Sequence, residues 1–262
     1  MPGVAFSHEQ KWPDALWIVR HGQSAGNVAR EEAERQGVPL IDIATRDMDT
    51  PLSRLGEQQA QALGHWFGTM PATEQPTVVL ASPYVRALET TRLLLSAAGI
   101  GPDAVSIQRD ERLREKEFGA LDRLTKVGIR QKFPELAEQR AHVGKFYFRP
   151  PGGESWCDVI LRLRSVLDTI TREHRGERVL IVGHQVTVNC LRYLFERMSE
   201  EQILDIDRRA DVPNCSVTSY AFDPAAGRKG KLVLRLINFV APLTEAGTRV
   251  TTAPDVPAAP KS

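Results

Sequence analysis

The sequence predicts an α/β protein with a mostly parallel central sheet that is covered by helices on both faces. Short apolar runs rich in strand-forming residues alternate along the chain with longer segments whose apolar residues recur at helical spacing. This alternation is typical of parallel pairing, because each parallel strand needs a long crossover connection to return to the sheet. The crossover helices then cover both faces of the sheet.

The expected elements follow this alternation in order. We expect strands at residues 16–19, 77–80, 104–108 and 178–182, and helices at 53–67, 83–97, 156–174 and 186–198. The helix at 156–174 has a clear start, because Ser155 and Asp158 resemble a capping box in which Asp replaces Glu. Ser82 and Pro83 form a second start signal, with Ser as the cap and Pro in the first turn. A late strand pair is expected at 217–221 and 231–237.

The length and charge limit the organisation and the partners of the chain. A chain of 262 residues has room for one large domain or two small ones. We expect a single catalytic domain over residues 1–243 and a disordered tail over 244–262, which is rich in Pro, Ala and Thr without periodicity. The formal net charge of +1 gives no basic field for nucleic acid, so a phosphate would have to bind at a local site.

Two further patterns bear on the location of the protein. No apolar run approaches the roughly 20 residues that span a bilayer, and the polar N-terminus lacks the layout of a signal peptide. The cysteines Cys157, Cys190 and Cys215 are odd in number and widely spaced, which favours buried thiols in a reducing compartment over disulfides or a zinc knuckle. We therefore expect a cytoplasmic protein without a membrane partner.

Basic residues and histidines follow three of the predicted strands. Arg20 and His21 follow the first strand, Arg86 comes six residues after the second, and His184 comes two residues after the strand at 178–182. Ligands of open parallel sheets bind beyond the carboxyl ends of the strands, so these side chains are expected at one edge. Each of them alone would be read as a packing or solvated residue. Their convergence favours a functional site.

The residue types suit phosphoryl transfer. Arg20 and Arg86 can each donate several hydrogen bonds to the oxygens of a phosphoryl group, and the first turn of a helix around Arg86 also favours an anion. A neutral imidazole at His21 can attack phosphorus and form a phosphohistidine. His184 can donate to an oxygen on which charge develops, and Gly22 lets the backbone pass close to the phosphate.

A leaving alkoxide also needs a proton, and the segment at 112–119 supplies two candidate donors. A carboxyl group beside a substrate phosphate has its pKa raised by the like charge, so it can be protonated near neutral pH. Glu115 and Glu117 both satisfy this requirement. The chemistry alone does not separate them.

The motifs around these residues resemble those of the histidine phosphatase superfamily, in its phosphoglycerate mutase-like branch. The resemblance spans about residues 16–218, and its motifs occur in the order of the family. They are an Arg-His-Gly segment followed by Ser and Asn (16–27), Pro-Leu-Ser then Gly then Gln-Ala (49–60), Ser-Pro-x-x-Arg-Ala-x-x-Thr (82–91), an acidic segment (113–119), Pro-Gly-Gly-Glu-Ser (151–155) and Val-Gly-His (182–184). Any one motif is weak, but six in order are specific.

The resemblance implies a fold and a set of roles. The fold would be a three-layer α/β/α sandwich with a mostly parallel sheet and an antiparallel edge strand. His21 would be the nucleophile, and Arg20, Arg86 and His184 would form the phosphate pocket together with Asn27. Glu115 matches the proton donor of the family, which favours it over Glu117. The family needs no metal, and we expect no cofactor for this chain.

The sequence departs from the family at three places. Gln185 follows His184, where many members of this branch have Gly and the acid phosphatases have Asp. Arg123 stands where relatives often have a small Gly, and residues 31–48 resemble an insertion. None of these departures removes a proposed catalytic residue.

We expect a phosphatase that acts on a small phosphorylated substrate, with phosphoproteins left open. A phosphoglycerate mutase is the alternative, but little in the sequence resembles the longer basic signature of the mutases. A binding module without activity is a third interpretation, and the retained His21 and arginines argue against it. Basic residues and the aromatic run Phe146–Phe148 in the segment at 116–151 would line the pocket only if they face it. A homodimer is a fair expectation, because dimers are the commonest oligomers.

Overall fold

Six strands form one sheet at the centre of the computed structural model, which describes residues 10–252. Their order across the sheet is β3-β2-β4-β1-β5-β6. Their bounds are β1 (Ala15–Arg20), β2 (Val78–Ala81), β3 (Ser106–Arg109), β4 (Arg178–Gly183), β5 (Val217–Asp223) and β6 (Lys231–Phe239). All six lie close to the positions that the sequence predicts.

The sheet is mostly parallel, as predicted. β4 pairs in parallel with both β1 and β2, and β2 pairs in parallel with β3. β5 runs antiparallel to β1, and β6 runs antiparallel to β5. The antiparallel strand is therefore second from the edge, and β6 forms the edge itself, because a short turn after Asp223 folds the two strands into a hairpin.

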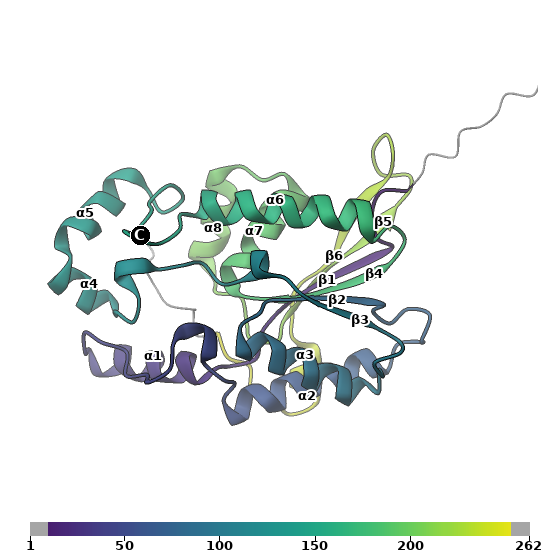
Figure 1. The fold of residues 1–262 in the computed structure, drawn as a ribbon, viewed down its shortest axis with the longest axis horizontal. Coiled ribbons are helices and arrows are strands. Elements are labelled where there is room, and N and C mark those ends of the chain that lie inside the picture. The colour runs from purple at the N-terminus through teal and green to yellow at the C-terminus, as the bar shows by residue number, and fades with distance from the viewer. Residues whose placement is uncertain (1–9, 253–262) are drawn as a thin grey trace, which may run out of the picture.

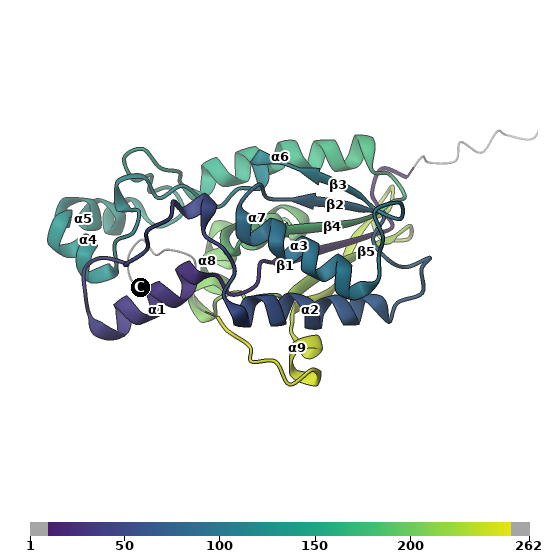
Figure 2. The same ribbon diagram turned by 60° about the horizontal axis from the view of Figure 1, so that its bottom comes forward.

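Helices cover both faces of the sheet and make the expected three layers (Figure 1). One face carries α6 (Trp156–Glu173), α7 (Gln185–Glu196) and α8 (Glu200–Arg209). The other carries α2 (Arg54–Gly68), α3 (Val85–Ala98) and the short α9 (Ala241–Glu245), which lies beside α2 in Figure 2. The capping box predicted for α6 is confirmed, because the Ser155 hydroxyl accepts from the Asp158 N–H and the Asp158 carboxylate accepts from the Ser155 N–H.

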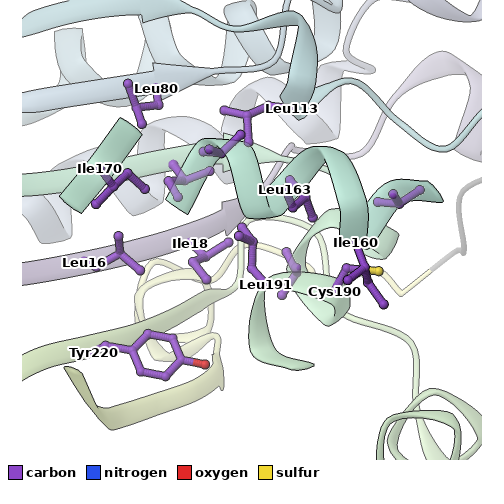
Figure 3. Close-up of a cluster of buried hydrophobic side chains, with 14 of the residues drawn as sticks. Leu16, Ile18, Leu80, Leu113, Ile160, Leu163, Ile170, Cys190, Leu191 and Tyr220 are labelled. Atoms are coloured by element: carbon purple, nitrogen blue, oxygen red, sulfur yellow. The ribbon is translucent and has the colours of Figure 1, made fainter. Parts of the chain in front are cut away.

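Alternating side chains of the buried strands supply two separate cores. Leu16 and Ile18 of β1 pack toward α6 and α7, whereas Trp17 and Val19 pack toward α2 and α3. Figure 3 shows Leu16 and Ile18 in the first of these cores together with Leu163 of α6. Burial of each such side chain contributes roughly 1.5–3 kcal/mol, so the strands are fixed in register by both faces.

Five α-helices of the described residues were not predicted from the sequence. They are α1 (Ala25–Gln36), α4 (Lys126–Lys132), α5 (Pro134–Val143), α8 and α9. α5 buries none of its residues, and α4 has only 7 residues. Neither helix therefore shows apolar residues repeating at helical spacing in the sequence. α1, α4 and α5 lie beyond the carboxyl ends of the parallel strands (Figure 1), where they form the surroundings of the predicted site.

The segment around α4 and α5 has a small core of its own. Leu121, Leu124, Ile129 and Phe148 pack together there. Phe146 belongs to the main core, and Tyr147 is exposed. The aromatic run Phe146–Phe148 is thus mainly structural, and it does not line the cleft described below.

The ordered part of the chain extends beyond residue 243, where the tail was predicted to begin. Residues 241–245 form α9, and Thr251 is buried, where its hydroxyl accepts from Gln59 Nε2 and donates to Asn214 Oδ1. The expectation of disorder is therefore wrong for residues 244–252. Residues 253–262 lie outside the described part of the chain. Within that part, no helix combines the length and the apolar character that crossing a bilayer requires.

Candidate active site

The strand order brings the predicted histidines together at the carboxyl edge of the sheet. β4 lies between β1 and β2, so the residues that follow these three strands become neighbours. The His21 N–H donates to Gly183 O at 2.9 Å, and the Ser82 N–H donates to Val182 O at 2.9 Å. The imidazole rings of His21 and His184 lie 5.1 Å apart between centroids, and both side chains are fully buried.

The hydrogen bonds of His21 define its tautomer. Arg86 Nε lies 3.2 Å from His21 Nε2, and a guanidinium N–H can only donate. Nε2 is therefore the acceptor, and Nδ1 carries the proton that it donates to Gly22 O at 2.7 Å. The result is a neutral imidazole whose Nε2, the nitrogen able to act as a nucleophile, faces the guanidinium of Arg86.

Residues that the sequence analysis missed hold the backbone around His21. Asn214 Nδ2 donates to His21 O at 3.0 Å, and the Gly22 N–H donates to Thr90 Oγ1 at 3.0 Å. A Cβ on Gly22 would lie 2.5 Å from Gly56 O, so the close approach at this glycine is to the first turn of α2. The glycine is thus required by this packing, whereas the sequence analysis assigned it to phosphate approach.

The two predicted arginines are both buried at this edge. Arg20 is fully buried and donates through Nη1 to Val212 O at 2.5 Å. The Arg86 side chain is 3% exposed and lies in the first turn of α3, as predicted. Its two Nη atoms contact Asp47, at 3.0 Å from Oδ1 and 3.2 Å from Oδ2.

Ser82 does not cap α3, in contrast to the prediction. The N-cap position is Tyr84, which makes no side-chain cap. The Ser82 hydroxyl lies 2.8 Å from His184 Nε2 and also accepts from the Tyr84 N–H at 3.3 Å. Ser82 therefore orients His184. The sequence did not predict this contact, because a Ser-Pro pair is typical of a helix start.

The structure separates the two candidate carboxylates. Glu115 is 1% exposed, and its Oε2 lies 3.9 Å from His184 Nδ1. The Glu117 side chain is 48% exposed and accepts a hydrogen bond from the Tyr84 hydroxyl at 3.2 Å. Burial, followed by the charges of Glu117 and Asp47, raises the pKa of Tyr84, so this hydroxyl stays protonated and donates. Only Glu115 lies among the buried residues of the site.

Lys116 is a buried cation next to Glu115. It is 7% exposed, its backbone N–H donates to Glu115 Oε1 at 2.7 Å, and its ammonium lies 4.5 Å from the centre of the Phe118 ring. Burial lowers the pKa of Lys116 to about 8, although the charges of Glu115 and Glu154 favour the protonated form. The sequence indicated only that Lys116 belongs to the basic segment at 116–151, and nothing in the local pattern marked it as buried.

Asn27 lies at the start of α1, where it completes a capping box with Ser24. Its Oδ1 accepts from the Ser24 N–H at 3.0 Å, and its own N–H donates to the Ser24 hydroxyl at 3.1 Å. The Asn27 side chain also lines a cleft together with Arg86 and Glu115. The structure therefore places Asn27 beside the predicted phosphate pocket.

This cleft has an empty volume of about 520 Å³, counting the solvent at its mouth. Its wall combines apolar side chains with charged ones, among them Ile41, Ile43, Asp47, Phe118 and Asp122. Three of these belong to the 31–48 segment, which resembled an insertion. The mixed lining suits an organic phosphate whose remaining part is small.

The second departure from the family shapes the same wall. Arg123 has a φ of +60°, a left-handed conformation that glycine adopts without strain. Its carbonyl accepts from the Ile41 N–H at 2.9 Å, which ties the 31–48 segment to the loop before α4. Gln185, the departure that follows His184, donates through Nε2 to Asp211 Oδ1 at 2.7 Å. Within residues 10–252, no three His, Cys, Asp or Glu side chains are grouped as metal ligands.

Residues 16–234 match the model of the histidine phosphatase superfamily (branch 1), and the chain belongs to this superfamily. The expected resemblance is thus confirmed, and with it a phosphatase or mutase type of enzyme.

Individual relatives carry both activities in their names. The chain is 29% identical over 202 residues to the 2,3-bisphosphoglycerate-dependent phosphoglycerate mutase of Rhizobium meliloti (strain 1021), covering 76% of this chain and 87% of that protein. It is 31% identical over 224 residues to the 6-phosphofructo-2-kinase/fructose-2,6-bisphosphatase of Caenorhabditis elegans, covering 82% of this chain but only 43% of that longer protein. Among solved structures, Bacillus stearothermophilus YhfR superposes with a TM-score of 0.67 at 27% identity, covering 87% of this chain and 98% of YhfR.

Proposed function

We propose that this protein is a metal-independent phosphomonoester hydrolase that acts through a phosphohistidine on His21. The observation that carries the proposal is the hydrogen bond from Arg86 Nε to His21 Nε2 in a buried site. It leaves the imidazole neutral and places a cation beside the nitrogen that attacks. The attacking group and the anion-binding group are therefore already adjacent.

The reaction has two steps. His21 Nε2 attacks phosphorus, the bond to the ester oxygen breaks, and Glu115 gives its proton to the leaving oxygen. Arg20, Arg86 and His184 donate to the non-bridging oxygens, which gain charge in the transition state. Water then attacks the phosphohistidine, its proton passes to the Glu115 carboxylate, and inorganic phosphate leaves with His21 restored. The buried position of Glu115, 3.9 Å from His184, supports this role.

A phosphoglycerate mutase-type phosphotransferase is the second candidate. It is favoured by the relative from Rhizobium meliloti, whose alignment covers most of both chains. The two reactions share the first step and differ in whether water or a second substrate molecule accepts the phosphoryl group. A module that only binds phosphorylated ligands is a third candidate, which the retained His21 and Arg86 make less favourable.

The partner we propose is a small phosphorylated molecule, because the cleft beside Arg86 is lined by both charged and apolar side chains. We propose a cytoplasmic enzyme that binds neither nucleic acid nor membrane. The net charge of +1 supports the absence of a nucleic-acid partner.

Activity that survives a strong chelator is expected for a site without metal. A loss of activity that a divalent ion restores would contradict the proposed metal independence.

The first test is steady-state hydrolysis of an aryl phosphate by the wild type and by His21→Ala. A mutase assay with and without bisphosphoglycerate is run beside it. We expect the wild type to hydrolyse the ester without isomerisation, and His21→Ala to lose roughly 10³-fold or more. His65→Ala is the control, because His65 is exposed on α2. Residual activity of His21→Ala near the wild-type level would refute the nucleophile, and fast isomerisation with slow hydrolysis would favour the mutase.

Glu115→Gln tests the proton donor. Poor leaving groups need the proton most, so their hydrolysis should fall by on the order of 10²-fold, while an activated aryl phosphate should lose far less. Glu117→Gln is the matched control, since Glu117 is two residues away and half exposed. Equal losses on both substrates would show that Glu115 positions the substrate instead.

A further inference from the structure

Asp47 contacts the arginine that the proposed function assigns to the phosphate. Its carboxylate oxygens lie 3.0 Å and 3.2 Å from the two Nη atoms of Arg86, and its carbonyl accepts from Nη1 at 2.6 Å. Two parallel N–H donors facing two oxygens is the arrangement in which an arginine also binds a phosphate. The side chain of Asp47 thus lies where phosphoryl oxygens are expected to bind.

The backbone around Asp47 is held in this position by its own turn. Asp47 opens a short 3-10 turn, Asp47–Asp49, and its carbonyl also accepts from the Thr50 N–H at 3.3 Å. The Thr50 hydroxyl in turn donates to Arg46 O at 3.1 Å and contacts the Thr45 hydroxyl at 3.1 Å. The carboxylate belongs to an ordered turn at the cleft, and 36% of its side chain is exposed there.

The charge of Asp47 also reaches the part of the cleft beyond Arg86. Asp122 lines the same cleft, and its pKa is raised, first by burial and then by the negative charge of Asp47. Two basic side chains, Arg30 and Arg123, lie in the same wall. Arg30 is paired with Glu34 at 3.0 Å, which offsets its charge. A second anionic group of a substrate would therefore meet two acidic side chains next to the phosphate pocket, with Arg123 as the basic side chain that opposes them.

We infer that Asp47 is a specificity-determining residue, whose carboxylate competes with the substrate phosphoryl group for Arg86 and disfavours substrates with a second anionic group. The inference rests on the proposed function, because it assumes that a phosphate binds at Arg86. The competition weakens the binding of free phosphate as well as that of substrate. It also selects esters with an uncharged or cationic leaving group over phosphoglycerates.

Asp47→Asn tests this inference, because the amide keeps the size of the side chain and removes its charge. Asp49→Asn is the matched control in the same turn, where Asp49 pairs with Arg46 on the surface at 2.6 Å. The readouts are the inhibition constant of inorganic phosphate, and kcat and KM for an aryl phosphate and for 3-phosphoglycerate. Circular dichroism confirms that both variants are folded.

We expect phosphate to inhibit Asp47→Asn roughly tenfold more tightly than the wild type, with Asp49→Asn unchanged. KM should fall for both esters and should fall further for 3-phosphoglycerate, while kcat changes little. Unchanged or weaker phosphate inhibition in Asp47→Asn would overturn the inference and leave the proposed function intact. A wild type that neither binds phosphate nor turns over any ester would overturn the proposed function itself, and this inference with it.

Discussion

Replacement of the buried Lys116 by methionine should stabilise the protein in a manner that depends on pH. The lysine is 7% exposed, and burial lowers its pKa from 10.5 to about 8. The folded state therefore holds the ammonium at a cost that the unfolded chain does not bear. Methionine has a similar length and can occupy the same space without a charge.

The size of the effect follows from the difference between the two pKa values. The fall from 10.5 to about 8 corresponds to about 3 kcal/mol, at 1.36 kcal/mol for each pH unit. Methionine also loses the contact of the ammonium with the Phe118 ring, which is worth roughly 1 kcal/mol. The expected net gain is about 2 kcal/mol near neutral pH.

The sign of the pH dependence is fixed by proton binding. Below pH 8 the lysine is charged in both states, so the penalty is fully present. Between pH 8 and 10.5 the unfolded state binds more protons than the folded state, and the stability of the wild type rises relative to the variant. The advantage of Lys116→Met should therefore shrink across this window and disappear by about pH 10.5.

Urea unfolding followed by circular dichroism, at several pH values across this window, measures the effect. Lys132→Met is the control, because Lys132 is exposed although its ammonium also lies over a ring, 5.4 Å from the centre of Phe133. The control should show no gain at any pH. A Lys116→Met variant that is less stable than the wild type below pH 8, or whose gain does not change with pH, would refute the reasoning.

Two further predictions concern the supports of the histidines. Gly22→Ala should lower stability by roughly 3 kcal/mol, because its Cβ would meet Gly56 O at 2.5 Å, whereas Gly101→Ala, with no atom within 4 Å, should be neutral in the same urea experiment. Ser82→Ala should lower kcat/KM by on the order of tenfold without unfolding the protein, because His184 loses a partner at 2.8 Å. The exposed Ser96→Ala is its control, and an unchanged kcat/KM would show that Ser82 does not orient His184.

The fold was predictable from local pattern wherever an element buries a broad apolar face. β1, α2 and α6 each carry such a face, and α6 also has its capping box. α5 buries nothing and α1 has few apolar residues, so neither could be found by periodicity. Residues 244–252 were misjudged because their composition is that of a tail, whereas their order comes from contacts with distant residues such as Gln59.

The site was predictable where its residues follow strands. His21 and His184 met at one edge because parallel strands end together. The choice between Glu115 and Glu117 depends on which of the two side chains the loop buries, and the local sequence does not determine this. The contact between Asp47 and Arg86 joins positions 39 residues apart, and no motif marks Asp47. Contacts of this kind between distant positions could not be predicted from the sequence.

The buried position of Thr251 has a practical consequence for anyone who shortens this chain. Thr251 binds Asn214, and Asn214 in turn donates to the carbonyl of His21. A stop codon placed after residue 243, where the composition suggests a boundary, would therefore remove a support of the catalytic backbone along with the supposed tail. A truncated version for crystallisation or screening should retain residues up to 252. If a shorter version shows low activity, loss of this support is the first explanation to test, before an unsuitable substrate is blamed.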